Sequence, residues 1–225
     1  MVLYVVGTGP EDREYITLKA LNTIARCSIV FGWRRTLERF RELLEGRRVF
    51  EIGSEDVYSS IESVVRSAAR DDVALLLRGD PCVAEANLMR MVRELCSRYG
   101  IRYSVVSGVS SLNIALARVG IDIAEAVVVS MHSSRDVERE LDSLKQFIRL
   151  GRYVVLYPKP SGKWVREIAG RILRSIECDA RVHLLQRLSF ENEITVVETL
   201  SKLASGEQQI DSYTIIVIEP CSHGG

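Results

Sequence analysis

Three short turns combine the residue types that hold small ligands through the main chain. They are Gly7–Asp12 (GTGPED), Arg78–Pro81 (RGDP) and Ser107–Ser111 (SGVSS). Glycine lets a ligand come close to the backbone, and N–H groups at the start of a helix can hold an anion. Each turn follows a predicted strand, and open α/β sheets bind ligands beyond the carboxyl ends of their strands. The turns therefore predict one binding crevice.

The second turn is the centre of this prediction. It follows Val73–Leu77, five apolar residues in a row, which is typical of a central parallel strand buried on both faces. Pro81 fixes the turn before a helical stretch that begins near Ala84. The alternative interpretation is an ordinary strand-to-helix turn in which Asp80 accepts hydrogen bonds from backbone donors.

Two other kinds of site are not favoured. The first turn is not the dinucleotide fingerprint G-x-G-x-x-G, because Asp12 stands where the third glycine should be. The 5 cysteines have no C-x-x-C spacing and the 3 histidines are scattered, so we expect no structural disulfide, no zinc site and no metal held by the protein.

Composition excludes several classes of protein. The chain has 225 residues, 47% of them hydrophobic, which suits one large or two small folded domains. Its 30 basic and 30 acidic residues balance, so the total charge favours neither a nucleic-acid nor a membrane partner. The first residues lack the pattern of a signal peptide, and no apolar run is long enough to span a membrane. We expect a cytoplasmic protein.

Strands and amphipathic helices alternate from residue 2 to about residue 121. This alternation predicts a mostly parallel, helix-covered sheet. Further along, the predicted strands at 182–186, 194–197 and 213–218 follow one another closely enough to pair antiparallel. The expected fold is therefore α/β in two domains, 1–121 with a mostly parallel sheet and 122–225 with a mixed α/β sheet.

The three turns, in this order, resemble the signatures of the tetrapyrrole (corrin/porphyrin) methylase family over nearly the whole chain. This family uses S-adenosylmethionine to methylate corrin precursors, and it includes diphthine synthase and a ribosomal RNA methylase. Two further segments, 31–37 (FGWRRTL) and 130–135 (SMHSSR), resemble the branch that methylates C5 of cobalt-precorrin-7. Two residues depart from the family pattern: Glu11 replaces a glycine, and Ser107 replaces a proline.

The resemblance implies a cofactor site in the cleft between the two domains. The expected cofactor-binding residues are Gly79, Asp80 and Val83 at the methionine part, Ser110 and Ser111 close by, and Tyr157 and Leu188 at the adenosyl part. Pro10 would shape the substrate floor. Because methyl transfer mainly needs alignment and exclusion of water, no catalytic residue is named.

A corrin precursor carries many carboxylates, which arginine binds through its planar fork. Four arginines at or after predicted strand ends are candidates for this contact, and His132 is a candidate proton relay, although a histidine that is simply packed or solvated is the alternative. The arginines are Arg34, Arg35, Arg78 and Arg135. Any cobalt would arrive inside the substrate. The family also implies a homodimer, and a C15 methylase that decarboxylates is a possible partner.

Three other functions stay open. A methylase of another ring position, or diphthine synthase, would keep the cofactor site and change the acceptor. A nucleotide-binding oxidoreductase would bind NAD. A binding module without catalytic activity would turn over no acceptor.

Overall fold

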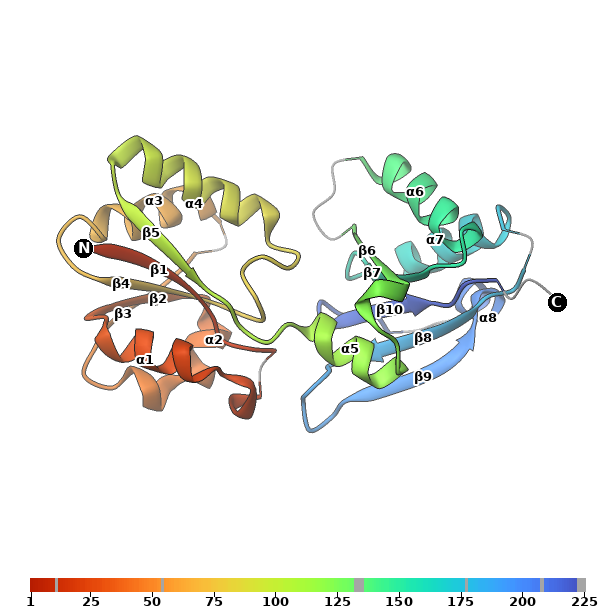
Figure 1. Ribbon diagram of the computed structural model, residues 1–225, viewed down its shortest axis with the longest axis horizontal. Helices are drawn as coiled ribbons and strands as arrows, with labels where there is room; N and C mark the ends of the chain where they lie inside the picture. Colours follow the sequence, from red (N-terminus) through yellow and green to blue (C-terminus); the bar gives the residue numbers. More distant parts are fainter. Residues whose placement is uncertain (11, 54, 132–135, 177, 207–208, 222–225) are drawn as a thin grey trace. The chain divides into compact units, whose positions relative to one another are not determined.

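The computed structural model describes residues 1–225 except 11, 54, 132–135, 177, 207–208 and 222–225. The chain forms two compact units, Met1–Ser111 and Leu112–Gly225. Each unit is built on one five-stranded sheet (Figure 1). The first sheet is entirely parallel and the second is mixed, which confirms the expected α/β class.

The first sheet has the strand order β3-β2-β4-β1-β5. Strand β4 lies at its centre, and all five of its residues are buried, as their uninterrupted apolar run predicts. The elements of this unit are β1 (Val2–Gly7), η1 (Arg13–Tyr15), α1 (Leu18–Arg26), β2 (Ile29–Gly32), α2 (Arg34–Arg39), η2 (Arg41–Leu44), β3 (Arg48–Glu51), α3 (Val57–Ser67), β4 (Val73–Leu77), α4 (Ala86–Tyr99) and β5 (Arg102–Val106).

Helices cover both faces of this sheet (Figure 1). Alternate residues of a strand point to opposite faces, so β4 contributes to two cores. Val73 and Leu75 pack with α3 and α4, whereas Ala74 and Leu76 pack with α1. Because both faces are filled, the ends of the strands are where a ligand can reach the backbone of this unit.

The second sheet has the order β6-β7-β10-β8-β9. Strands β6 and β7 are parallel, β10 is antiparallel to β7 and β8, and β9 is antiparallel to β8. Apolar residues of α6, α7 and α8 pack on one face of the sheet. The elements are α5 (Ser111–Val119), η3 (Ile123–Glu125), β6 (Ala126–Ser130), α6 (Val137–Arg149), β7 (Tyr153–Tyr157), α7 (Gly162–Leu173), β8 (Arg181–Gln186), β9 (Ile194–Thr199), α8 (Leu200–Ser205) and β10 (Thr214–Ile218).

The division between the units precedes the boundary expected at 121/122. Helix α5 lies in the second unit almost entirely, since the first unit ends at Ser111. One bond that holds it there is the ion pair from Arg118 Nε to Glu193 Oε1, at 2.6 Å. Helix α5 follows the last strand of one sheet and precedes the first strand of the next along the chain. Its amphipathic pattern would be the same whichever sheet it packed on, so the sequence alone does not show to which unit it belongs.

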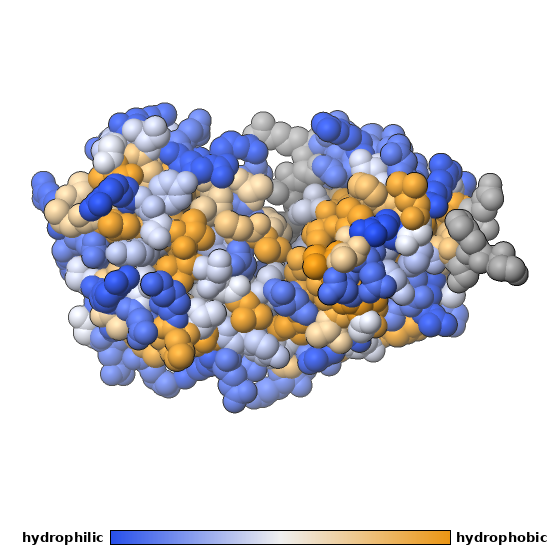
Figure 2. All heavy atoms as spheres, in the orientation of Figure 1, coloured by the Kyte–Doolittle hydropathy of each residue, from blue (hydrophilic) through white to orange (hydrophobic). Residues whose placement is uncertain are grey.

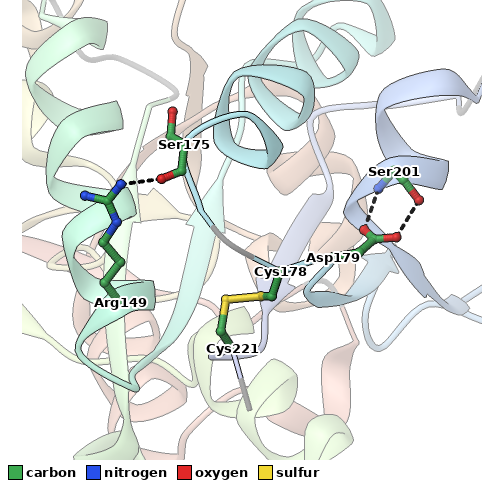
Figure 3. Close-up of a disulfide and its surroundings, with 6 residues drawn as sticks. All are labelled: Arg149, Ser175, Cys178, Asp179, Ser201 and Cys221. Atoms are coloured by element: carbon green, nitrogen blue, oxygen red, sulfur yellow. Dashed lines mark hydrogen bonds between the residues drawn. A yellow bond between two sulfur atoms is a disulfide. The ribbon is translucent and has the colours of Figure 1, made fainter. Parts of the chain in front are cut away.

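A disulfide joins Cys178, which precedes β8, to Cys221, which follows β10 (Figure 3). The expectation of no structural disulfide is therefore wrong. The two cysteines are 43 residues apart, and only the antiparallel pairing of β8 with β10 brings these loops together. Beside the bond, Asp179 accepts hydrogen bonds from the N–H and hydroxyl of Ser201, at 2.8 and 2.6 Å (Figure 3). The disulfide and this carboxylate both tie the segment before β8 to other elements.

Across the described part of the chain, no helix has the length and apolar character needed to cross a bilayer.

Candidate active site

The carboxyl ends of three neighbouring strands carry the three ligand-binding turns. Strand β1 pairs with β4 on one side and with β5 on the other. Gly7 lies opposite Leu77, and Val6 lies opposite Val106, so the three strands end at the same edge of the sheet. The turns that the sequence places far apart are therefore brought together, as predicted.

The three turns meet at glycine backbones. A Cβ atom on Gly108 would lie 2.3 Å from the carbonyl oxygen of Gly79, and one on Gly7 would lie 2.6 Å from both that oxygen and the Gly108 nitrogen. Real Cβ atoms do not approach backbone atoms this closely. The sequence needs glycine at Gly7 and Gly108 because the main chains of the turns touch there.

Hydrogen bonds join the first two turns. Gly79 N–H donates to the carbonyl of Gly9 at 2.7 Å, and Gly9 N–H donates to the carbonyl of Gly79 at 3.3 Å. The N–H and hydroxyl of Thr8, which is 1% exposed, both donate to the carbonyl of Leu77, at 2.9 and 3.1 Å. These bonds fix the backbones of the first two turns relative to each other.

Asp80 joins the second turn to the third. Its Oδ2 accepts a hydrogen bond from Gly108 N–H at 3.1 Å, and its Oδ1 accepts one from Cys82 N–H at 2.7 Å. Hydrogen bonds to a charged acceptor are among the stronger ones in proteins. Asp80 therefore positions the second and third turns. This agrees with the alternative interpretation of the sequence, in which Asp80 accepts hydrogen bonds from backbone donors.

Gly79 leaves one side of its backbone open. Its φ is +68°, a conformation that other residues rarely adopt, and a Cβ atom built there meets nothing within 4 Å. The carbonyl of Gly79 therefore packs against the other two turns. The opposite side of the residue, where a side chain would stand, is accessible. This is the feature that a closely approaching ligand requires.

The remaining expected residues of the first unit lie around these turns. Pro10 is buried beside Gly9, and Val83 is half-buried after its N–H closes a turn onto the Asp80 carbonyl at 3.0 Å. Ser110 is 4% exposed and immediately precedes Ser111, the first residue of α5. Ala84 has a φ of +65°, so the chain between the turn and α4 is held in an uncommon conformation.

Two expected substrate arginines follow β2, which lies next to β4. Gly32 at the end of β2 pairs with Leu76, so Arg34 and Arg35 share the sheet edge with the turns. Arg34 Nε donates to Glu38 at 2.9 Å, and this hydrogen bond raises the pKa of Arg34. Arg78 is exposed directly after β4. His132 and Arg135 lie outside the described residues, as does Glu11.

Tyr157 and Leu188 belong to the second unit. Tyr157 ends β7, and Leu188 is 3% exposed just after β8. Both strands are antiparallel to β10, so both residues lie at the same edge of the second sheet. Tyr157 and Leu188 therefore form a second group of expected residues, at one edge of the second sheet.

Strain and unpartnered hydroxyls mark this second group. Arg187 and Ser189, on either side of Leu188, have φ values of +51° and +72°. Within the described residues, the buried Oγ atoms of Ser189 and of Ser130, which ends β6, have no hydrogen-bond partner. Backbone strain and unsatisfied polar atoms concentrate at functional sites. Sequence reasoning missed these residues, because neither feature has a sequence signal.

Sequence reasoning also missed Thr8, Gly7 and Gly108 as individual site residues, although the turns containing them were identified. The signal for the glycines was present, since Gly7 and Gly108 each lie within two residues of a predicted strand end. What the sequence does not show is that these glycines touch one another.

A parallel sheet with three glycine turns at one edge, followed by a mixed sheet, is the architecture of a known class of enzymes. Residues 2–204 match the sequence pattern of the Tetrapyrrole (Corrin/Porphyrin) Methylases. The chain belongs to this family and is a methyltransferase.

Individual relatives are consistent with this. The chain is 26% identical over 211 residues to a probable cobalt-precorrin-7 C(5)-methyltransferase of Methanocaldococcus jannaschii, covering 92% of this chain and 93% of the relative. It is 28% identical over 228 residues to a probable cobalt-factor III C(17)-methyltransferase of Methanothermobacter thermautotrophicus, covering 96% of this chain and 62% of that one. The crystal structure of the precorrin-6Y methylase of Archaeoglobus fulgidus has a TM-score of 0.74 and 26% identity, covering 97% and 98% of the two chains.

Proposed function

We propose that this chain methylates C5 of cobalt-precorrin-7 in cobalamin biosynthesis, with S-adenosylmethionine as the methyl donor. The observation that carries the proposal is the meeting of three backbone turns at Gly7, Gly79 and Gly108. Support for the ring position comes from two similar proteins of nearly the same length, whose names specify precorrin-7 C5 and precorrin-6Y methylation.

The residues of the first unit fit a methyl donor. Gly79 leaves its backbone open on one side, and a ligand there would lie beside Val83 and Asp80. Ser110 and Ser111 stand on the third turn, which Asp80 holds through Gly108. We assign these residues to the methionine part of the cofactor, and Tyr157 and Leu188 to its adenosyl part.

S-adenosylmethionine, when bound, supplies a methyl group on a positively charged sulfur. The chain's own contribution is to hold the acceptor carbon in line and to keep water away. The hydrogen bonds from Thr8 to Leu77 and between Gly9 and Gly79 make the backbone rigid at this point. Rigid alignment of reacting groups can lower a barrier by about 7–11 kcal/mol, so a site built from turns is sufficient for this class of reaction.

For the acceptor, we propose that the side-chain carboxylates of the corrin precursor pair with arginines at the same sheet edge. Arg34, Arg35 and Arg78 are the candidates in the described residues, with Pro10 at the floor. Arg34 already forms an exposed ion pair with Glu38, which a substrate carboxylate would have to replace. His132 and Arg135 stay candidates for proton relay and carboxylate binding.

The cellular context is part of the proposal as well. We propose a cytoplasmic enzyme that acts as a homodimer, with a C15 methylase and decarboxylase as its pathway partner. Any cobalt enters within the substrate, and we propose no metal bound by the protein.

Product analysis tests the ring position. The protein is incubated with cobalt-precorrin-7 and S-adenosylmethionine carrying a ¹³C methyl group, and the product is examined by NMR. We expect one labelled methyl group, attached at C5. Label at another carbon would overturn the C5 proposal. Transfer only to cobalt-factor III, at C17, would replace it with the activity that the second relative's name describes.

A further inference from the structure

A hollow of about 720 Å³ lies at the amino edge of the first sheet. Its lining contains residues where strands begin, namely Ile29 in β2 and Arg48 in β3, and residues just before β4 and β5, namely Asp71 and Ile101. The strands of a parallel sheet begin at one edge and end at the other, and the five residues of β4 span about 16 Å. The hollow is therefore distinct from the glycine turns at the carboxyl edge, and its size is that of a small-molecule site.

One side of α3 forms a wall of this hollow. Its lining residues follow one another at intervals of four or three, which places them on the same side of a helix; they are Ser59, Ser63, Arg66 and Arg70. Helix α3 ends at Ser67, and the N–H of Arg70 donates to the Ser67 carbonyl at 3.3 Å, so the winding continues as far as Arg70. A hydroxyl and two guanidinium groups thus face the hollow from one element.

The carboxylates of the hollow are already bound by its own donors. Asp71 accepts a hydrogen bond from Arg48 Nη2 at 3.0 Å. Glu62 accepts one from Arg66 Nη2 at 3.2 Å and another from the hydroxyl of Tyr99. Because these acceptors are committed, the hollow offers little to a cation.

Donors, in contrast, are left over. A guanidinium carries five N–H groups, and within the described residues Arg48 and Arg66 use only Nη2. Across the same residues, the guanidinium of Arg70 and the hydroxyl of Ser63 have no hydrogen-bond or ion-pair partner. Three arginines also outnumber the two carboxylates in the lining. What the hollow lacks is an anion with several acceptor atoms.

The end of α3 is prepared for an anion as well. The last carbonyls of a helix carry partial negative charge, which would repel one. Here the carbonyls of Arg66 and Ser67 accept the N–H groups of Ala69 and Arg70, at 3.1 and 3.3 Å. These bonds reduce the repulsion, so the arginine side chains set the sign of the charge in the hollow.

We propose that this hollow binds a small phosphate ester. Its phosphate accepts hydrogen bonds from Ser63, Arg66 and Arg70 on α3, while Arg48 approaches from β3. A tetrahedral phosphate presents oxygens to both sides at once, whereas a planar carboxylate matches a single arginine fork. The divided placement of the donors therefore favours a phosphate.

The rest of the ligand is apolar and small. Ile29 and Ile101 lie among the lining residues beside the charged wall, and an apolar group on the phosphate would rest on them. Hydrophilic side chains gather over the outer side of α4, which packs beside α3 (Figure 2). This part of the unit therefore suits a ligand from solution rather than the headgroup of a lipid surface.

Titration of the ¹⁵N-labelled chain with phenyl phosphate, followed by NMR, tests the site. We expect saturable shifts of the backbone amides of Arg48, Ser63 and Arg70, with those of Gly79 and Gly108 unchanged. Inorganic phosphate, which lacks the apolar group, and benzoate, which carries a carboxylate on the same ring, are the comparison ligands. Both should bind more weakly than phenyl phosphate.

Arg70→Met removes the unpaired cation and keeps the length of the side chain. We expect it to weaken phenyl phosphate binding by about tenfold, since a hydrogen bond to a charged group is lost. Arg93→Met is the matched control, because Arg93 is exposed on the neighbouring α4 but does not line the hollow. It removes the same charge from the same unit and should bind like the parent.

Shifts that do not saturate, equal weakening in both arginine variants, or benzoate binding as tight as that of phenyl phosphate would overturn the proposal. Shifts confined to Gly79 and Gly108 would also overturn it, because the ligand would then lie at the carboxyl edge. The titration needs neither methyl donor nor acceptor, so it can fail while the proposed methyl transfer holds. Arg70→Met should in turn bind S-adenosylhomocysteine like the parent.

Discussion

Asp80 holds the Gly108 turn in place: its Oδ2 accepts a hydrogen bond from Gly108 N–H at 3.1 Å, across 28 residues of sequence. Its other oxygen accepts from Cys82 N–H at 2.7 Å. One carboxylate therefore sets the geometry of the second and third turns, and the first turn is joined to the second through Gly9 and Gly79.

Removal of this carboxylate should release the third turn. In Asp80→Ala, Gly108 N–H loses its acceptor, and we expect its amide hydrogen exchange to accelerate by about tenfold or more, since a hydrogen bond to a charged group contributes about 1.5–3 kcal/mol. Exchange at the core strand β4 serves as the internal control and should change little. Unchanged protection of Gly108 in the variant would contradict the positioning role of Asp80.

The sequence predicted the turns but not what holds them. The run Val73–Leu77 identifies the central strand because no polar residue interrupts it, and the alternation of strands and helices gives the parallel sheet. The contacts among Gly7, Gly79 and Gly108 depend on strand order, which places β1 between β4 and β5. No local pattern specifies that order, and the same holds for the pairing that brings Cys178 to Cys221.

The disulfide should stabilise the second unit. A covalent link that closes a loop of 43 residues reduces the entropy of the unfolded chain, and such bonds typically contribute about 2–4 kcal/mol. We expect a reducing agent, Cys178→Ser and Cys221→Ser each to lower Tm by roughly 5–15 °C, and reductant to have no further effect on either variant. Cys82→Ser is the control and should keep its response to reductant. A parent Tm that is insensitive to reductant would show that the bond contributes nothing.

The three free cysteines should differ sharply in reactivity. Burial raises the pKa of Cys27 and of Cys96 to about 11 in each case, whereas Cys82 is exposed. The thiolate is the reactive form, so at pH 8 a thiol reagent should label Cys82 rapidly and the other two only after unfolding. We expect one thiol per native chain, three after denaturation and five after reduction, out of 5 cysteines. Two or more fast native thiols would contradict the described burial or the disulfide.

The pair formed by Arg118 and Glu193 should give the second unit a specific pH dependence. The hydrogen bond from Arg118 lowers the pKa of Glu193 in the folded chain. A lowered folded-state pKa means that the pair stabilises the fold above the unfolded pKa of about 4.3 and loses this effect as the pH falls through the folded value. Because both side chains are partly exposed, the contribution is about 1 kcal/mol at pH 7.

We therefore expect Arg118→Met to lower the free energy of unfolding at pH 7 and to approach the parent as the pH falls through the lowered pKa of Glu193. Urea unfolding at several pH values measures this difference. Glu193→Gln is the second single variant, which completes a double-mutant cycle together with the variant that carries both substitutions. A difference that grows toward low pH would have the wrong sign for this pair.

The central claim is that the meeting of the three glycine turns holds the methyl donor, and calorimetric titration with S-adenosylhomocysteine tests it most directly. A Cβ on Gly108 would lie 2.3 Å from the Gly79 carbonyl, whereas one on Gly53 meets only Ser60 Oγ at 3.8 Å. Gly108→Ala should thus push the turns apart, and Gly53→Ala is its matched control. We predict binding by the parent and by Gly53→Ala, and at least tenfold weaker binding by Gly108→Ala and by Asp80→Ala, an effect of about 1.4 kcal/mol. Equal affinity in all four proteins would contradict the claim.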